Sequence, residues 1–169
     1  MKNLPPAGVK WLKALHLLFV CMWVGGALGI LCVQNLLTAR GAELYGMDLA
    51  SKLIDDLVVI PGAMGSLATG LLYSLFTPWG FFKHRWVAVK WGITVYGILF
   101  GTFFLGPWLN SLPPVSGELG AGALDNYAYM RARGLNSVWG GFQVATLLFA
   151  LFISVLKPWR RAQDRGALS

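Results

Sequence analysis

Charged side chains are scarce in this sequence. Of its 169 residues only 12% are Asp, Glu, Lys or Arg, about half the usual share of a soluble chain, while 56% are hydrophobic. This balance argues against a soluble domain and indicates a membrane protein. The net charge of +7 does not require a nucleic-acid partner, because most of the excess lies in segments that we expect to meet anionic lipid.

Cysteine is equally rare, with Cys21 and Cys32 as its two occurrences. Eleven residues along a straight helix correspond to a rise of about 16 Å, whereas a disulfide requires alpha carbons within about 7 Å. A Cys-x-x-Cys redox motif is also missing, and no internal repeat indicates a transporter built from two halves. We interpret both cysteines as small apolar residues in lipid or in packing contacts.

Long apolar runs, by contrast, dominate the sequence. Four of them are close to or above the roughly 20 residues that cross the hydrocarbon of a bilayer. The first is too long for the core of a signal peptide and lacks a small-residue cleavage site. We predict an all-α fold, a four-helix transmembrane bundle that forms a single integral membrane domain over 1–169. Its predicted spans are 11–37, 57–79, 86–108 and 138–156.

Lysine and arginine are distributed unevenly between the segments that flank these runs. They gather before residue 14, around residues 83–90 and after residue 156, whereas the other two loops are balanced or acidic. Cytoplasmic segments of membrane proteins carry such an excess. The pattern therefore predicts that both termini face the cytoplasm (N-in/C-in), in a bacterial inner membrane.

Acidic residues cluster near the opposite interface. We expect Asp48 to cap the second helix, because its carboxylate can accept from the free amides of a first turn. We interpret Asp55 and Asp56, with Arg40 across the loop, as helix-end ion pairs. The alternative is an entry site for a cation or proton.

The first apolar run carries His16, the only histidine within any long apolar run. At 3.6 residues per turn, His16, Trp23 and Gln34 share one face of a helix. Gly25 and Gly29 lie on roughly the opposite face, where we expect close packing against another helix. The face of His16 is therefore a candidate for the interior of the bundle.

Three further side chains lie at about the level of His16. Lys90 is four residues inside the third run from the same side, and Trp23 and Trp91 lie deeper than an interfacial tryptophan belt. Ionisable groups within membrane helices usually face the interior and have a role. His16 can ligate a haem iron or another metal, or bind a quinone oxygen. Lys90 can pair with a ligand carboxylate or extend to the headgroups, and His84 is a second metal ligand or an exposed loop residue.

The stretch Trp11-Leu-Lys-Ala-Leu-His-Leu-Leu-Phe-Val-Cys-Met-Trp-Val-Gly-Gly resembles the first helix of HemJ-type protoporphyrinogen oxidases, of the CopD copper-resistance family and of the four-helix proteins grouped as DUF2269. Trp86-Val-Ala-Val-Lys-Trp resembles the HemJ segment with a lysine early in its third helix. The resemblance implies haem b binding, with roles for His16 and Lys90, and a membrane oxidoreductase. After Gly26 the chain departs from the HemJ pattern, because Gly-Ile-Leu-Cys-Val-Gln stands where HemJ has a further histidine.

Our leading hypothesis is a haem b-binding membrane protein with a redox or haem-linked role. His16 is the candidate axial ligand, and Lys90, Trp23 and Trp91 are candidate cofactor contacts. The second metal ligand is His84, or His16 of another protomer in a homo-oligomer. The alternative is a non-enzymatic membrane component, either an accessory subunit of a larger complex or a permease for a metal or small solute. The expected partners are lipid and a quinone or porphyrin.

Overall fold

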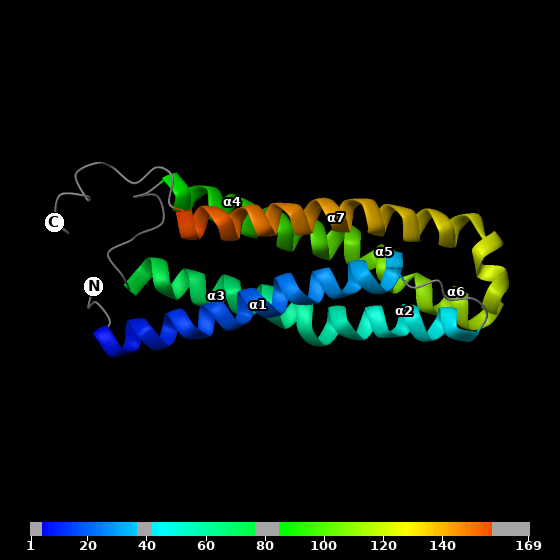
Figure 1. Ribbon diagram of the computed structural model, residues 1–169, viewed down its shortest axis with the longest axis horizontal. Coiled ribbons are helices and arrows are strands. Elements are labelled where there is room, and N and C mark those ends of the chain that lie inside the picture. The colour runs from blue at the N-terminus through cyan, green and yellow to red at the C-terminus, as the bar shows by residue number, and fades with distance from the viewer. Residues whose placement is uncertain (1–4, 37–41, 77–84, 157–169) are drawn as a thin grey trace.

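Four long helical rods make up the described part of the chain, which comprises residues 5–36, 42–76 and 85–156 of a computed structural model (Figure 1). Lipid offers backbone groups no hydrogen-bond partners, so apolar runs of this length satisfy their own groups as helices. Each rod is long and apolar enough to cross a membrane. The all-α, four-helix prediction is confirmed, and the fold fits a multi-pass membrane protein.

The first and last rods are single helices, whereas the middle two are composite. α1 covers Pro6–Leu36 and α7 covers Tyr127–Leu156. The second rod consists of α2 (Ala42–Ile54), η1 (Asp55–Val59) and α3 (Ile60–Phe76). The third rod and its extension consist of α4 (Arg85–Phe100), η2 (Gly101–Leu105), α5 (Gly106–Asn110), α6 (Leu112–Leu119) and η3 (Gly120–Asp125).

Both composite rods contain a π-helical segment at the same place relative to a proline. η1 ends two residues before Pro61, and η2 ends two residues before Pro107. Proline lacks the N–H that an α-helix needs and its ring clashes with the carbonyl four residues back, so the helix widens there. The widened turns are closed by bonds from the N–H of Ile60 to Asp55 and from the N–H of Gly106 to Gly101.

Glycines let α3 approach α1 closely. A Cβ at Gly62 would lie 2.6 Å from the backbone nitrogen of Trp23, and a Cβ at Gly26 would lie 2.8 Å from Val59. At Gly25 and Gly29 a Cβ would meet no described atom within 4 Å. Gly25 and Gly29 therefore make no close contact with another described helix of the same chain, because α3 lies against the neighbouring face of α1, and their packing against another protomer stays a prediction.

One end of the bundle is closed by a buried polar network, and we call it the network end. Asp48 is fully buried and accepts hydrogen bonds from the Tyr129 hydroxyl at 2.8 Å and from Gln34 Nε2 at 3.3 Å. Gln34 also donates to Ser51 at 3.0 Å, and Arg133 donates to the Gln34 carbonyl at 2.9 Å. Asp48 lies inside α2, so its predicted capping role is wrong.

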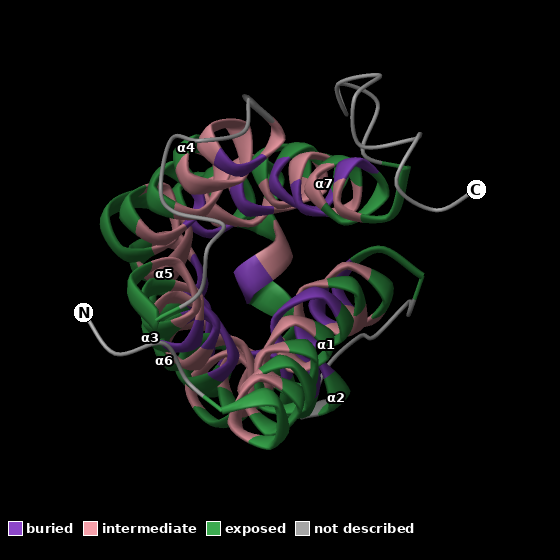
Figure 2. Ribbon diagram, turned by 90° about the vertical axis from the view of Figure 1, so that its left-hand side faces the viewer, coloured by how far each residue is buried: buried purple, intermediate pink, exposed green. Residues whose placement is uncertain are grey.

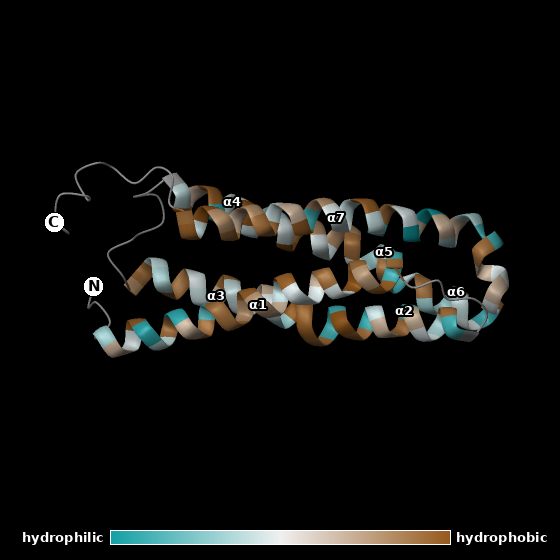
Figure 3. Cartoon of the chain, in the orientation of Figure 1, coloured by the Kyte–Doolittle hydropathy of each residue, from teal (hydrophilic) through white to brown (hydrophobic). Residues whose placement is uncertain are grey.

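The opposite end holds Lys10, Lys13 and Lys90, and we call it the lysine end. Viewed from this side, α1 lies beside α3 and α4 beside α7, and most buried residues face inward from these pairs (Figure 2). Hydrophilic residues concentrate in the first turns of α1 and at the network end, whereas the middle of the rods is mainly hydrophobic (Figure 3). The functional candidates lie between the two helix pairs.

Candidate functional site

A cavity of about 490 Å³ lies at the lysine end between the two helix pairs. It brings together three of the residues that the sequence singled out, namely His16 from α1 and Lys90 and Trp91 from α4. Lys13 also lines it, and no acidic residue does within the described chain. The remaining lining side chains are mostly apolar or aromatic, and they include Leu17, Leu67, Tyr73, Trp86, Val87 and Val155.

A contact between α1 and α3 orients the His16 ring. His16 Nδ1 lies 2.9 Å from the Thr69 hydroxyl oxygen, which itself lies 2.6 Å from the Gly65 carbonyl. The Thr69 hydroxyl donates to that carbonyl, and its oxygen can accept from His16 in the tautomer that carries the proton on Nδ1. The lone pair of the neutral ring is then on Nε2. This is how a metal-ligating histidine is normally held, with its other ring nitrogen donating to a second group.

Two cations give this cavity its charge. Lys90 lies with its Nζ 6.0 Å from the centre of the Trp86 ring, and Lys13 approaches from the first turns of α1. The one ion pair among the described residues joins Lys52 to Asp56, so neither lysine is neutralised by a carboxylate there. An ammonium group pairs readily with a carboxylate or phosphate. The cavity therefore suits a ligand with anionic groups on an apolar body.

The tryptophans separate into different environments. Trp91 donates from Nε1 to Ser74 at 3.3 Å, which joins α4 to α3 beside the cavity. Trp23 lies deeper and does not line this cavity, so the structure does not bring it together with His16, Lys90 and Trp91. The reason is that two turns along α1 move a side chain about 10 Å along the rod. His84 lies outside the described residues.

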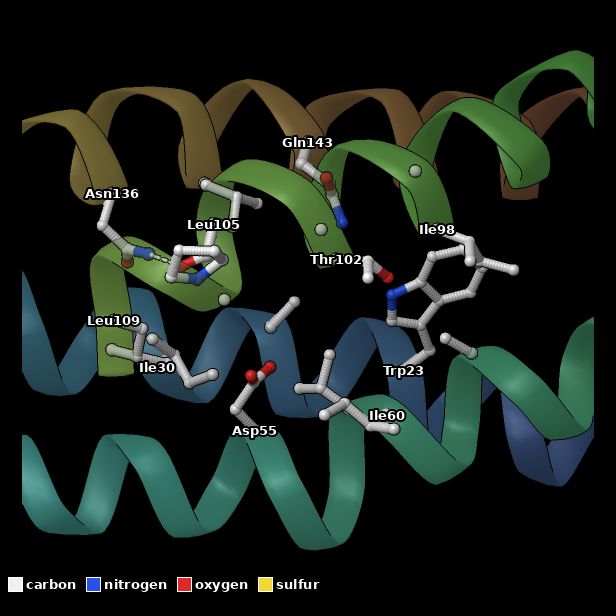
Figure 4. A pocket seen from close by; sticks show the side chains of 18 of the residues that line it. Trp23, Ile30, Asp55, Ile60, Ile98, Thr102, Leu105, Leu109, Asn136 and Gln143 are labelled. Atoms are coloured by element: carbon white, nitrogen blue, oxygen red, sulfur yellow. Dashed lines mark hydrogen bonds between the residues drawn. The ribbon is translucent and has the colours of Figure 1, made fainter. Parts of the chain in front are cut away.

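Trp23 instead lines a second cavity, of about 430 Å³, between η1 and η2 (Figure 4). Asp55 lines the same cavity from the interior of the continuous helix 42–76 and not from its end, and Arg40, the partner expected across the loop, lies outside the described residues. Asp56 pairs with Lys52 at 2.6 Å on its own helix. Across the cavity, Asn136 donates to the Leu105 carbonyl at 3.0 Å beside the second π-helical segment.

Sequence reasoning missed Thr69 and Lys13 as parts of the first site. Thr69 is 53 positions from His16, and no spacing rule connects residues on different helices. Lys13 was visible only as one of several flanking charges. Its position one turn before His16 places both on one face, which is the signal that could have found it.

The described residues contain no group of three His, Cys, Asp or Glu side chains placed to hold a metal ion. A metal held by protein ligands alone therefore has no support in this part of the chain, whereas haem iron needs only one or two axial ligands. No family, curated protein or solved structure compared with this chain matches it.

Proposed function

We propose that this integral membrane protein binds haem b in the cavity at the lysine end, with a redox or haem-linked role. The observation that carries the proposal is the position of His16 on the cavity wall with its Nδ1 2.9 Å from the Thr69 hydroxyl, an arrangement in which Nε2 would be the nitrogen that binds iron. Haem b, when bound, supplies one-electron chemistry at its iron.

The residues around His16 fit such a group. Lys13 and Lys90 can pair with two propionate carboxylates, and Trp86 and Trp91 supply flat apolar walls. Thr69 holds the His16 ring in one tautomer and one orientation. A second protein ligand to the iron, if there is one, would be His84 or His16 of another protomer.

The expected orientation is part of the same proposal. With both termini in the cytoplasm of a bacterial inner membrane, the cavity opens toward the cytoplasmic half of the bilayer. A cysteine that replaces exposed Glu118 in a chain with Cys21→Ser and Cys32→Ser should react with an impermeant maleimide from outside intact cells. Reaction only after the membrane is opened would reverse the orientation.

Absorption spectra of the purified protein, supplied with haem during expression, test the proposal. The wild type should show a Soret band and sharp alpha and beta bands on reduction. His16→Ala should lose or shift these bands while the protein still inserts, because insertion depends on hydropathy. Lys90→Met should retain the spectrum but weaken haem retention about tenfold, the effect of losing one charged contact.

Leu15→Ala is the matched control, because Leu15 is exposed on the same helix and does not line the cavity. Its spectrum should equal that of the wild type. A wild type that takes up no haem would contradict the proposal and favour the non-enzymatic alternatives, an accessory subunit or a permease. An unchanged spectrum in His16→Ala would remove His16 as the ligand.

A further inference from the structure

The second cavity, between η1 and η2, shares no lining residue with the first. We propose that it binds a small organic cation, an ammonium group carried on an apolar body, through the carboxylate of Asp55. π-helical segments are rare and are often found at functional sites, and here two of them face one cavity.

Charge is the first argument for a cation. Asp55 is the single charged residue among the described residues that line the cavity. Lys52, the nearby cation on the same rod, is already paired with Asp56 at 2.6 Å. A carboxylate away from water is costly without an opposite charge, and an ionisable group inside a membrane helix usually marks a path or a site. The charge that would balance the Asp55 carboxylate in this cavity is therefore positive, as in a cationic ligand.

A second polar group points into the same space. Gln143 of α7 is only 5% exposed, and its buried side-chain oxygen Oε1 has no hydrogen-bond partner among the described residues. In Figure 4 the Gln143 and Asp55 side chains point into the cavity from opposite walls, and Thr102 lines it beside the Trp23 indole. Buried amides are nearly always hydrogen-bonded. A ligand with its own polar group would supply that partner.

The size and the walls of the cavity favour an organic cation over a metal ion. Calcium takes six to eight oxygen ligands at about 2.3–2.6 Å and magnesium takes six at about 2.0–2.1 Å, whereas this cavity offers one carboxylate and has a volume of about 430 Å³. Its walls include Ile60 and Ile98, and the Trp23 indole borders it (Figure 4). Apolar surface and an aromatic ring suit the body of an ammonium compound.

Calorimetric titration of the purified full chain in phosphatidylcholine nanodiscs tests the proposal, with empty nanodiscs subtracted. The probes are benzylammonium and its uncharged analogue benzyl alcohol. The wild type should bind benzylammonium about tenfold more tightly or better, because only the ammonium pairs with a carboxylate. Asp55→Asn should abolish this preference, and Asp56→Asn, whose carboxylate does not line the cavity, should keep it.

Gln143→Glu provides a second variant that does not depend on the folding of Asp55→Asn. A second carboxylate on the opposite wall should tighten benzylammonium binding and leave benzyl alcohol binding unchanged. Equal binding of the two probes by the wild type would overturn the proposal, as would a preference that survives Asp55→Asn. Tighter binding of sodium ions than of benzylammonium, followed by sodium NMR, would overturn the assignment to an organic cation.

Discussion

The two ends of this bundle hold their helices together in different ways. At the network end, the buried apolar cluster around Leu44 and Leu112 surrounds a chain of hydrogen bonds from Gln34 through Asp48 to Tyr129. At the lysine end, the described polar contacts include His16 to Thr69 and Trp91 to Ser74, and a cavity lies between the helix pairs.

This difference indicates that the two ends of the rods have different roles, one in stability and the other in ligand binding. A buried hydrogen-bond network that joins several helices rigidifies the region that contains it, even though Gln34 Oε1 has no partner among the described residues. Space for a ligand instead requires side chains that do not fill the interior. We therefore expect substitutions at the network end to reduce stability most, and substitutions at the lysine end to change binding while stability changes little.

The largest loss of stability should follow Asp48→Ala. The hydroxyl of Tyr129 and the amide of Gln34 would both lose their acceptor in a buried site, at a cost of about 3 kcal/mol in the free energy of unfolding. Equilibrium unfolding in mixed micelles of increasing SDS fraction measures this change in the free energy of unfolding. Glu43→Ala, an exposed acidic residue on the same helix, is the control and should change stability by less than about 0.5 kcal/mol. A small effect of Asp48→Ala would show that the network end does not dominate stability.

Gly62→Ala should come next, with a loss of about 2 kcal/mol. The added Cβ would lie 2.6 Å from the backbone nitrogen of Trp23, which can move only if α1 moves. Gly25→Ala is the matched control on α1, where a Cβ meets no described atom, and it should be neutral or stabilise by up to about 1 kcal/mol. The same unfolding assay distinguishes them, and equal losses in the two variants would contradict the observed packing.

Tyr129→Phe removes one hydroxyl from the network end and should cost about 1–2 kcal/mol, because Asp48 keeps its donor from Gln34. Tyr127→Phe, at a tyrosine that is 79% exposed, should have no measurable effect. A double variant with Asp48→Ala should lose no more than Asp48→Ala alone, since both changes break the same bond. Additive losses would mean that the two side chains act separately.

The smallest effect on stability should come from Thr69→Val at the lysine end. It removes the acceptor of His16 Nδ1, and hydrogen bonds between membrane helices are worth about 0.6 kcal/mol on average. Thr146→Val, whose hydroxyl bonds only to the Gln143 carbonyl of its own helix among the described residues, is the control. If haem is bound, Thr69→Val should also broaden or shift its spectrum, because His16 loses its orientation. A loss as large as that of Asp48→Ala would remove the contrast between the two ends.

The inward face of α1 could be predicted from helical spacing. Trp23 and Gln34 are buried and His16 is half-buried, as their common face indicated. The same spacing could not show which neighbour meets the other faces, and it could not show that no described helix of the chain meets Gly25 and Gly29. Periodicity defines a face on one helix, whereas close approach depends on two helices.

The acidic residues show the same limit of prediction from helical spacing and local sequence. Near the end of a predicted span, Asp48 and Asp55 were assigned to a helix cap and a helix-end ion pair. In the folded chain Asp48 meets Tyr129, 81 positions away, and Asp55 lies beside a cavity formed with η2. A local pattern cannot distinguish a helix end from a helix interior when the apolar run is shorter than the helix that contains it.

The sequence by itself determined the class of the protein, four membrane-spanning helices. Hydropathy is a sum over neighbouring residues, and a backbone in lipid has to bond to itself. Only the tertiary structure decided which polar side chains meet. It places His16 beside Thr69 and Asp55 across a cavity from Gln143. It also places Trp23 and Trp91 in different cavities. These contacts join segments that are distant in the sequence, so they form only when the rods pack. Their geometry depends on how the helices cross and on where two prolines widen them.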